Sequence, residues 1–375
     1  MSRAALRLLV YSAQLEAVGG IESHVQEFCL RMAAAGQHVT LLSSRSCLDS
    51  RSKDRLRRAG VALLLNEGRW LSASPARKWL WTIGTLARLS LRKFDVVYTN
   101  GQGLNSVSVL RWFRGRARLI HHHHTSCDAG DIALWPAAYR EAMRRADALV
   151  VCAGFIRQRM QNAIGRRDVE VVYCFSRNVS ATMQPRNSDM PVALGYFGRL
   201  IDGKGIRRIL ELSRDPRLAG VQWKLWGSEG AYRASDFQAY PNVIYLGAFS
   251  DEAGLRAALA SIDCFVLLST DPEGLPVSLM EVMAAGKPWI ATRQGGIPEL
   301  AHDPASCVLV GADKEEEIIE ACLAMVARIK AREVDAIAQQ AFYANRLGDR
   351  VLLARWLALL KGREDTPDST QALQQ

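Results

Sequence analysis

The chain has 375 residues, of which 49% are hydrophobic and 23% are charged. This length predicts two domains, and the composition is that of a globular chain able to bury two cores. All apolar runs fall short of the roughly 20 residues that a membrane-spanning helix needs, and 48 Lys and Arg against 38 Asp and Glu give a net charge of +10.

The start of the chain and its cysteines indicate the compartment. Residues 1–11 lead into an apolar segment that is too short and too interrupted for a signal peptide, so we expect a cytoplasmic protein. The eight cysteines show no C-x-x-C pair and no metal-ligand spacing, and several lie within apolar runs. A reduced cysteine in such a run behaves as a small hydrophobic residue, so we expect free thiols.

The positive charge is concentrated in the first half of the chain, up to residue 185, whereas the remainder is slightly acidic. A basic half predicts an anionic partner, such as a membrane surface, a lipid-phosphate acceptor or a nucleic acid. The chain has no zinc finger, RNP aromatic pattern or KH loop, so no nucleic acid is expected. We therefore predict a peripheral contact with the anionic inner face of the cytoplasmic membrane.

Short apolar runs of strand length alternate with helix-length amphipathic segments. Nearly continuous apolar strands separated by helices predict an α/β fold with parallel sheets covered on both faces. The expected strands are 5–11, 38–43, 61–65, 95–99, 118–122, 148–152 and 169–173 in the first half, then 192–197, 221–226, 243–246, 264–268, 288–292 and 307–310. Segment 176–191, which has no periodicity, is the expected linker.

Two glycines, Gly19 and Gly20, lie where the first expected strand gives way to a helix. Glycines at such a turn allow backbone N–H groups to approach a phosphate closely. The segment lacks the full G-x-G-x-x-G pattern, and no acidic residue ends the second strand, so a dinucleotide site is a poor interpretation. The alternative is that the pair only forms a turn.

Tryptophan and basic residues are interleaved in segments 69–94 and 111–116. On one face of a helix, this combination is typical of a protein that lies in a membrane interface. The alternative is that the tryptophans belong to the core and the basic residues to a solvated face.

Four consecutive histidines, His121 to His124, continue the strand that begins at residue 118. Alternation along a strand places His122 and His124 on one side and His121 and His123 on the other. Adjacent histidines can bind zinc, but no further ligand is placed by spacing. Asp128 and Asp131 follow in a polar loop that we expect to face an acceptor molecule.

The second half opens with a glycine-containing loop, residues 194–206, that Arg199 and Lys204 bracket. The glycines leave this loop open, which makes Arg199 and Lys204 candidate site residues. The alternative is a basic surface loop.

The segment 271–300 predicts a strand–helix–strand unit. Pro276 suits the first turn of a helix, because its missing N–H would be unpaired there anyway. The helix should end near Ala285, with Gly286 as a left-handed stop and Pro288 preventing continuation.

Two carboxylates frame the start of this helix. Glu273 precedes it, and Glu281 lies about 12 Å further along the axis. Between them, the backbone of Gly274, Leu275, Pro276 and Val277 presents the free N–H groups of a helix N-terminus, which bind anions. A sugar nucleotide has hydroxyl groups at both ends and phosphate between them, so it matches this arrangement.

This segment resembles the E-x7-E signature of the retaining family 4, or group 1, glycosyltransferases of the GT-B fold. By that resemblance, Glu273 contacts the donor sugar and Glu281 the nucleotide ribose, while Arg199 and Lys204 neutralise the donor diphosphate. The loop at Gly19 and Gly20 is expected to reach the diphosphate and the acceptor. Segments 226–230 and 242–249 are similar to the family's two loops around the base.

The family often carries a histidine at the carboxyl end of the fifth strand, near the donor sugar. The resemblance assigns this catalytic position to His124, with His122 as its neighbour. Segment 172–176 departs from the family, whose members commonly have an Asn-Gly turn there, and this puts the interdomain contacts in question.

The resemblance implies two Rossmann-like domains that face each other across a cleft. We expect an acceptor-side domain at 1–180 and a nucleotide-sugar domain at 181–340. A C-terminal helix at 341–362 should cross back to the first domain, and the polar tail 363–375 should be disordered.

The expected function is metal-independent transfer of a hexosyl group from a nucleotide sugar to a glycan or lipid-linked acceptor, in lipopolysaccharide or polysaccharide synthesis. No cofactor is expected, because the chain has no Asp-x-Asp motif at a strand end and its cations and helix N-termini can replace a divalent metal. The alternatives are a GT-B-fold sugar-nucleotide epimerase and a non-catalytic nucleotide-sugar-binding protein.

Overall fold

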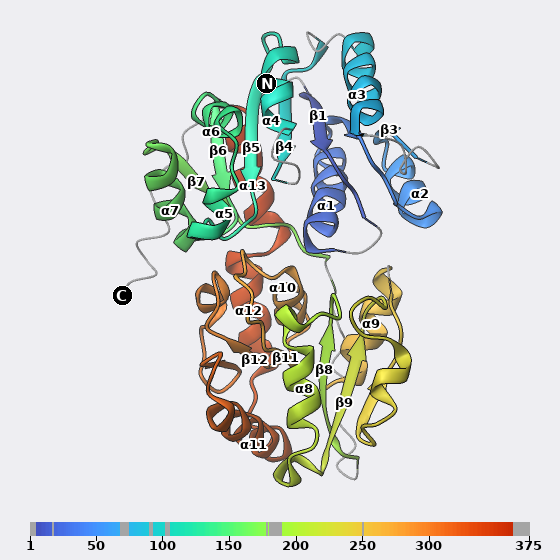
Figure 1. Cartoon of the computed structure of the whole chain (residues 1–375), viewed down its shortest axis with the longest axis vertical. Coiled ribbons are helices and arrows are strands. Elements are labelled where there is room, and N and C mark those ends of the chain that lie inside the picture. The colour runs from blue at the N-terminus through green and yellow to red at the C-terminus, as the bar shows by residue number, and fades with distance from the viewer. Residues whose placement is uncertain are drawn as a thin grey trace.

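Two parallel sheets, each with helices packed around it, form the two lobes of the molecule (Figure 1). The computed structural model describes residues 5–16, 19–67, 75–89, 93–101, 106–177, 179, 190–249 and 251–362. The tail 363–375 and most of the expected linker lie outside these residues. Within the described part, no helix is both long and apolar enough to cross a membrane.

The first sheet has the strand order β3-β2-β1-β4-β5-β6-β7. Its strands are β1 (Arg7–Ser12), β2 (His38–Ser43), β3 (Ala62–Leu65), β4 (Val96–Asn100), β5 (Arg118–His123), β6 (Ala148–Val151) and β7 (Val169–Val171). Its helices are α1 (Gly20–Ala34), α2 (Ser50–Arg58), α3 (Pro75–Leu89), α4 (Ser106–Phe113), α5 (Ala129–Ala133), α6 (Ala137–Arg144) and α7 (Gly154–Ile164). Every strand that the apolar runs predict is present.

The second sheet has the order β10-β9-β8-β11-β12-β13. Its strands are β8 (Val192–Phe197), β9 (Val221–Trp226), β10 (Val243–Tyr245), β11 (Cys264–Leu267), β12 (Trp289–Thr292) and β13 (Cys307–Val310). The helices around it are α8 (Ile206–Leu212), α9 (Glu252–Ser261), α10 (Val277–Ala284), α11 (Glu315–Ala331) and α12 (Ala336–Arg346). The prediction that Gly286 is a left-handed stop is confirmed, because its φ is 70° just after α10.

The strand order of the two sheets indicates where ligand-binding loops should lie. In both sheets all strands are parallel and the strand order reverses beside the first strand, since β1 lies between β2 and β4 and β8 lies between β9 and β11. Open parallel sheets bind ligands at the carboxyl ends of their strands, at such a switch point. Gly19 follows β1, Arg199 follows β8 and Glu273 follows β11, so all three lie at these ends.

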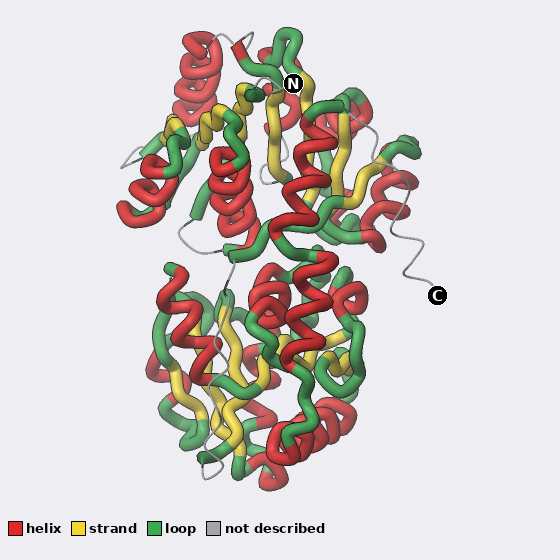
Figure 2. Tube along the Cα trace, turned by 180° about the vertical axis from the view of Figure 1, so that it is seen from behind, coloured by secondary structure: helices red, strands yellow, loops and turns green. Residues whose placement is uncertain are grey.

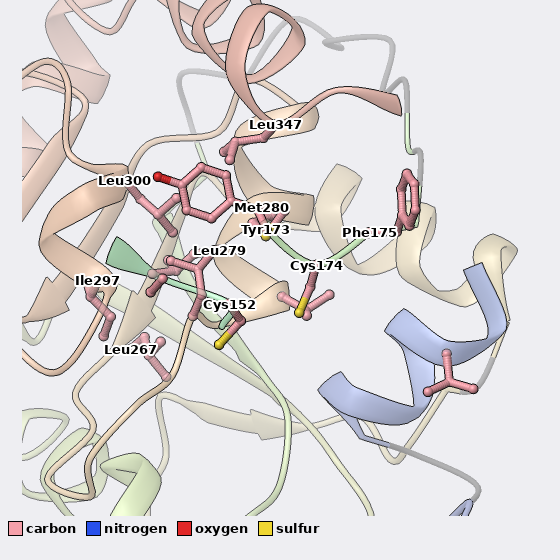
Figure 3. Close-up of a cluster of buried hydrophobic side chains, with 14 of the residues drawn as sticks. Cys152, Tyr173, Cys174, Phe175, Leu267, Leu279, Met280, Ile297, Leu300 and Leu347 are labelled. Carbon is pink, nitrogen blue, oxygen red and sulfur yellow. The ribbon is translucent and has the colours of Figure 1, made fainter. Parts of the chain in front are cut away.

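A continuous apolar cluster joins the two lobes (Figure 3). Cys152 and Phe175 come from the first lobe and its connecting segment, and Leu279 and Ile297 come from the second. A polar contact adds to this junction, because the Glu299 carboxylate accepts hydrogen bonds from the N–H groups of Gly154 (2.9 Å) and Phe155 (2.8 Å). These N–H groups open α7, where a carboxylate is favoured by the helix dipole.

The C-terminal segment is not one helix, contrary to the expectation for 341–362. It breaks at Leu347 and Gly348 into α12, which packs on α10, and α13 (Asp349–Leu360). Trp356 of α13 packs against Phe28 of α1, with 5.1 Å between ring centroids, and against Tyr98 of β4. The chain thus leaves the second lobe and returns to the first, as Figures 1 and 2 show. The break at the extended Gly348 gives the change of direction that one straight helix would not.

Candidate active site

A cavity of about 590 Å³ lies between the carboxyl ends of the two sheets. All of the predicted site residues except His122 line it: Gly19, Gly20, His124, Arg199, Lys204, Glu273, Gly274, Leu275, Pro276, Val277 and Glu281. The expected base-binding segments also reach it, through Trp226, Gly227, Ala248 and Phe249. The sequence therefore predicts the composition of this wall, although residues 17 and 18 of the glycine loop lie outside the described residues.

The loop before α10 touches the end of β5 directly. A Cβ on Gly274 would collide with the carbonyl oxygen of His124, so only glycine permits this approach of backbone to backbone. The close contact places Glu273 of the second lobe beside His124 of the first. Residues from the two lobes therefore meet on one side of the cavity.

Two helix N-termini converge on the cavity. α1 begins at Gly20 and α10 at Val277, and a Cβ on Gly20 would lie 3.6 Å from a methyl group of Val277. The first N–H groups of a helix have no intrahelical partner, and the helix dipole makes this end positive. The cavity is thus built to accept negative charge between the lobes.

Glu273 is a buried carboxylate with a fixed set of partners. The ammonium of Lys204 forms an ion pair with its Oε1, and the hydroxyl of Ser269 donates to the same oxygen at 2.5 Å. Lys204 ends the short helical turn Asp202–Lys204, which packs on the strand-end loop because the N–H groups of Thr270 and Asp271 donate to the carbonyl of Gly203. The two motifs, distant in the chain, therefore form one unit.

Glu281 has an arginine partner that the sequence did not indicate. The Arg177 guanidinium holds both carboxylate oxygens, with Nε to Oε1 at 2.6 Å and a terminal nitrogen to Oε2 at 3.2 Å. The same guanidinium lies 5.6 Å from the ring centre of Phe249. Arg177 lies in the segment expected to be a linker, where an isolated basic residue looks solvated, and nothing local pairs it with a residue 104 positions away.

Arg199 differs from the other two cations of the cavity wall. Its side chain is exposed, and it forms no ion pair or side-chain hydrogen bond with another described residue. Its position is set by the backbone, since its carbonyl accepts a hydrogen bond from the Tyr196 hydroxyl at 2.8 Å. Arg199 is therefore available to an anion in the cavity without breaking an ion pair or side-chain hydrogen bond to any part of the chain that the structure describes.

His124 reaches the cavity, whereas His122 lies behind it. The two rings lie 4.0 Å apart, as the predicted alternation requires, but His122 is fully buried and absent from the wall. Burial lowers the pKa of His124 well below its usual range, and neighbouring histidines lower it further. His124 is therefore neutral at pH 7, and its Nε2 has no partner among the described residues. His122 is therefore the buried neighbour of His124 and does not line the cavity.

The polar loop after β5 is held by internal contacts. Asp131 accepts hydrogen bonds from Trp135 (3.1 Å) and Thr125, and lies 3.8 Å from His123. Partial burial alone would raise the pKa of Asp131, but hydrogen bonds from His123, Thr125 and Trp135 lower it to about 2. Asp131 and Asp128 both line the cavity, so the first lobe contributes ionised carboxylates to it.

Among the residues that the structure describes, two groups of side chains bring metal-binding atoms within 4.8 Å of one another. The first comprises His24, His122 and His124, and the second comprises His123, Cys127 and Asp131. His24, a member of the first group, and Tyr98, which contacts that group, are functional candidates that the sequence did not suggest. An isolated histidine in α1 and a tyrosine in a buried strand carry no signal beyond their apolar surroundings.

Two family profiles match the chain. The profile described as "Glycosyltransferase Family 4" matches residues 18–175, and that described as "Glycosyl transferases group 1" matches residues 191–328. The matches fall on the two lobes in turn and together cover most of the chain.

Relatives and solved structures point the same way. The putative colanic acid biosynthesis glycosyltransferase WcaL of Salmonella typhimurium is 25% identical over 61% of this chain, and the match spans 59% of WcaL. The phosphatidyl-myo-inositol mannosyltransferase of Mycobacterium leprae is 23% identical over 84% of this chain and 86% of its own length. The structure of Anabaena Alr3699/HepE in complex with UDP and glucose has a TM-score of 0.72 at 18% identity, covering 95% of this chain and 99% of HepE.

The HepE likeness shows the fold, which is GT-B. With both lobes matched in order by profiles of one enzyme class, the chain belongs to the family 4, group 1 glycosyltransferases.

Proposed function

We propose that this protein is a retaining glycosyltransferase that moves a sugar from a nucleoside-diphosphate sugar to a glycan or lipid-linked acceptor. The observation that carries the proposal is the single cavity in which Glu273 and Glu281 flank the N-terminus of α10, with Arg199 and Lys204 beside it. WcaL, named for colanic acid biosynthesis, supports a role in the synthesis of a surface polysaccharide or lipopolysaccharide.

In the proposed complex, Glu281 binds the ribose and the diphosphate lies against Arg199 and the converging helix N-termini. Lys204 turns from Glu273 toward the phosphate, which leaves Glu273 to accept hydrogen bonds from the donor sugar. His124, neutral and with Nε2 unpartnered, bonds a sugar hydroxyl. The named cations and dipoles stabilise the charge that grows on the leaving diphosphate, so no divalent metal is required.

The proposed reaction uses no protein nucleophile. The bond from the anomeric carbon to the diphosphate oxygen breaks, and the acceptor hydroxyl forms a new bond on the same face. Its proton passes to the departing phosphate oxygen. Attack on the same face retains the configuration of the anomeric carbon.

We also propose that the first lobe contacts an anionic membrane. α3 and α4 expose Leu80 (70% of its surface) and Trp112 (78%), and Arg111 lies 5.1 Å from the centre of the Trp112 ring. Apolar and basic side chains on one surface are typical of interfacial helices. Residues 69–74 and 90–92 of the predicted segment lie outside the described residues. The lipid named for the M. leprae relative is consistent with an acceptor held at a membrane.

A thermal-shift screen with UDP, GDP, ADP and dTDP and their sugars tests the donor site. A ligand that binds only the folded state stabilises it by RT ln(1 + [L]/Kd), about 2.7 kcal/mol at 100 times Kd. We expect one nucleotide family to raise the melting temperature of the wild type and of Glu316→Ala, an exposed control, but not of Glu281→Ala. Each variant is compared with its own melting temperature without nucleotide. If no nucleotide stabilises the wild type, or if Glu281→Ala responds equally, the donor assignment is wrong.

A further inference from the structure

Two buried tyrosine hydroxyls connect the histidines on either side of β5. The Tyr98 hydroxyl lies 3.0 Å from Nε2 of His24 and 2.8 Å from Nδ1 of His122. On the opposite side, the Tyr139 hydroxyl lies 3.0 Å from Nε2 of His121 and 2.9 Å from Nδ1 of His123. The sequence places these histidines on two faces, and each face has its own tyrosine.

A backbone group fixes the direction of the Tyr98 network. The N–H of Phe175 donates to Nδ1 of His24 at 2.9 Å, and a backbone N–H can only donate. Nδ1 must therefore carry a lone pair. Burial lowers the pKa of His24 to about 3, so the ring is neutral at pH 7 and its one proton lies on Nε2.

The remaining protons follow in sequence. His24 Nε2–H donates to the Tyr98 oxygen, which leaves the Tyr98 O–H to donate to Nδ1 of His122. Burial lowers the pKa of His122 well below its usual range, so this ring is also neutral and carries its proton on Nε2. One backbone N–H thus determines the tautomers of two histidines.

We propose that Phe175 N–H, His24, Tyr98 and His122 form one directed hydrogen-bond chain that holds His122 beneath His124 and thereby orients His124 toward the cavity. His24 and Tyr98 are positioning residues in this proposal. The ring of His124 lies 4.0 Å from His122 and 5.4 Å from His24, so both help to confine it. The Cys174 thiol, 3.6 Å from Nδ1 of His124, confines it from a third side.

The same hydrogen-bond chain argues against a metal ion bound by His24, His122 and His124, although their ligand atoms lie close together. A metal needs a lone pair on the ligating nitrogen. His24 uses its only lone pair to accept from Phe175, and His122 uses its own to accept from Tyr98. Two of the three histidines therefore have no lone pair left for a metal.

The hydrogen-bond chain begins at Phe175, in the segment that joins the two lobes. Within residues 174–177, Cys174 and Phe175 contact the histidines, whereas Arg177 binds Glu281 of the second lobe. The Ser176 hydroxyl forms a hydrogen bond with the Tyr343 hydroxyl of α12 at 2.8 Å. One short segment therefore sets the position of site residues on both sides of the cavity.

Long-range ¹H–¹⁵N NMR of the histidine-labelled full chain tests the proposal directly. Chemical shifts and couplings distinguish the two neutral tautomers, and single His→Gln variants assign the signals. We expect His24 and His122 to be Nε2–H tautomers at pH 7. An Nδ1–H tautomer at either residue would refute the proposed hydrogen-bond chain. It would also be refuted if added Zn²⁺ shifted the signals of both histidines in the way that direct metal ligation does.

Two tyrosine variants test whether Tyr98 is the residue that fixes the tautomer of His122. Tyr98→Phe removes the donor to His122, so His122 should lose its single tautomer, whereas His24 should keep Nε2–H because Phe175 still donates to it. Tyr139→Phe is the control and should alter only His121 and His123. If both variants affect His122 equally, Tyr98 does not set its tautomer and the proposal fails.

A double-mutant cycle tests whether Tyr98 acts through His124, and this readout alone rests on the proposed function. Once a donor is identified, Tyr98→Phe should lower kcat in the wild type but have no further effect in a His124→Ala background. Additive losses would refute the positioning role. If no transfer occurs at all, the proposed function fails, while the NMR result still decides whether the chain exists.

Discussion

Glu273 and Glu281 are buried carboxylates, and each has a cationic partner from another part of the chain. An ionised carboxylate that is removed from water without such a partner is very costly. The two ion pairs therefore stabilise the fold as well as shape the binding site. The motif at 273–281 contains only the two carboxylates and neither of their cationic partners. The loop motif at 194–206 predicts Lys204 as a site residue, whereas Arg177 is apparent only from the fold.

Removal of the Arg177 side chain tests this dependence. In Arg177→Met, the Glu281 carboxylate remains buried without its partner, and we expect a loss of about 3 kcal/mol in the free energy of unfolding. The double variant Arg177→Met/Glu281→Gln should recover much of this loss, because no buried charge is left unpaired. Denaturant unfolding of the chain without nucleotide measures both effects.

An exposed ion pair provides the control for this cycle. Arg256 and Glu252 lie on the surface of α9, where solvent screens their charges, so Arg256→Met should change stability little. If Arg177→Met is as stable as the wild type, or if the double variant is no better than the single one, Glu281 does not depend on Arg177.

Elements explain how residues so distant in the chain meet. β8 and β11 are neighbours in one sheet, so the loops that carry Lys204 and Glu273 leave the same edge. α1 and α10 come from different lobes, yet their N-termini face one cavity. Helix starts and strand ends are set by local sequence, and their convergence is set by the packing of the lobes.

The exposed faces of α3 and α4 carry the membrane prediction. Transfer of a large apolar side chain out of water contributes about 1.5–3 kcal/mol. Leu80→Ser/Trp112→Ser should therefore weaken binding to vesicles that contain phosphatidylglycerol by at least about tenfold. Co-sedimentation measures this, with Ile337→Ser, an equally exposed residue of α12, as the control.

Lipid composition separates a membrane contact from general adhesion. The basic residues should make binding stronger to anionic vesicles than to phosphatidylcholine vesicles, and added salt should weaken it. Equal binding of the double variant and the wild type would show that α3 and α4 do not form the contact.

At the scale of the whole molecule, apolar runs predict every strand among the described residues. Strands buried on both faces, such as β1, β4, β8 and β11, are apolar along nearly their whole length, and the half-buried strands β3, β7 and β10 are short apolar runs as well. The helix before Gly286 is predicted as well, since its proline and glycine signals are local. The break at Gly348 was not predicted: the apolar pattern continues through it, and only the return of the chain to the first lobe requires a turn there.

In the candidate site, too, the residues that a local sequence signal marks could be predicted, and those placed by long-range packing could not. Residues carried by a motif, such as Glu273 and Arg199, could be predicted because their spacing is itself the signal. Arg177, His24 and Tyr98 could not, because their hydrogen-bond partners lie 24 or more residues away and are brought together only by the fold. His122 was placed on the correct face of β5, but the packing of Trp356 over that face, which buries it, was not apparent.

The most direct test of the central claim is the product formed from an α-linked donor of the nucleotide family that binds. The chain would be incubated with this donor and a panel of alkyl glycosides, and ¹H NMR would identify the new anomeric linkage. The account predicts an α-linked product and release of the nucleoside diphosphate, both lost in Glu273→Ala and retained in the surface control Glu316→Ala. A β-linked product, or epimerisation of the donor without use of an acceptor, would contradict it.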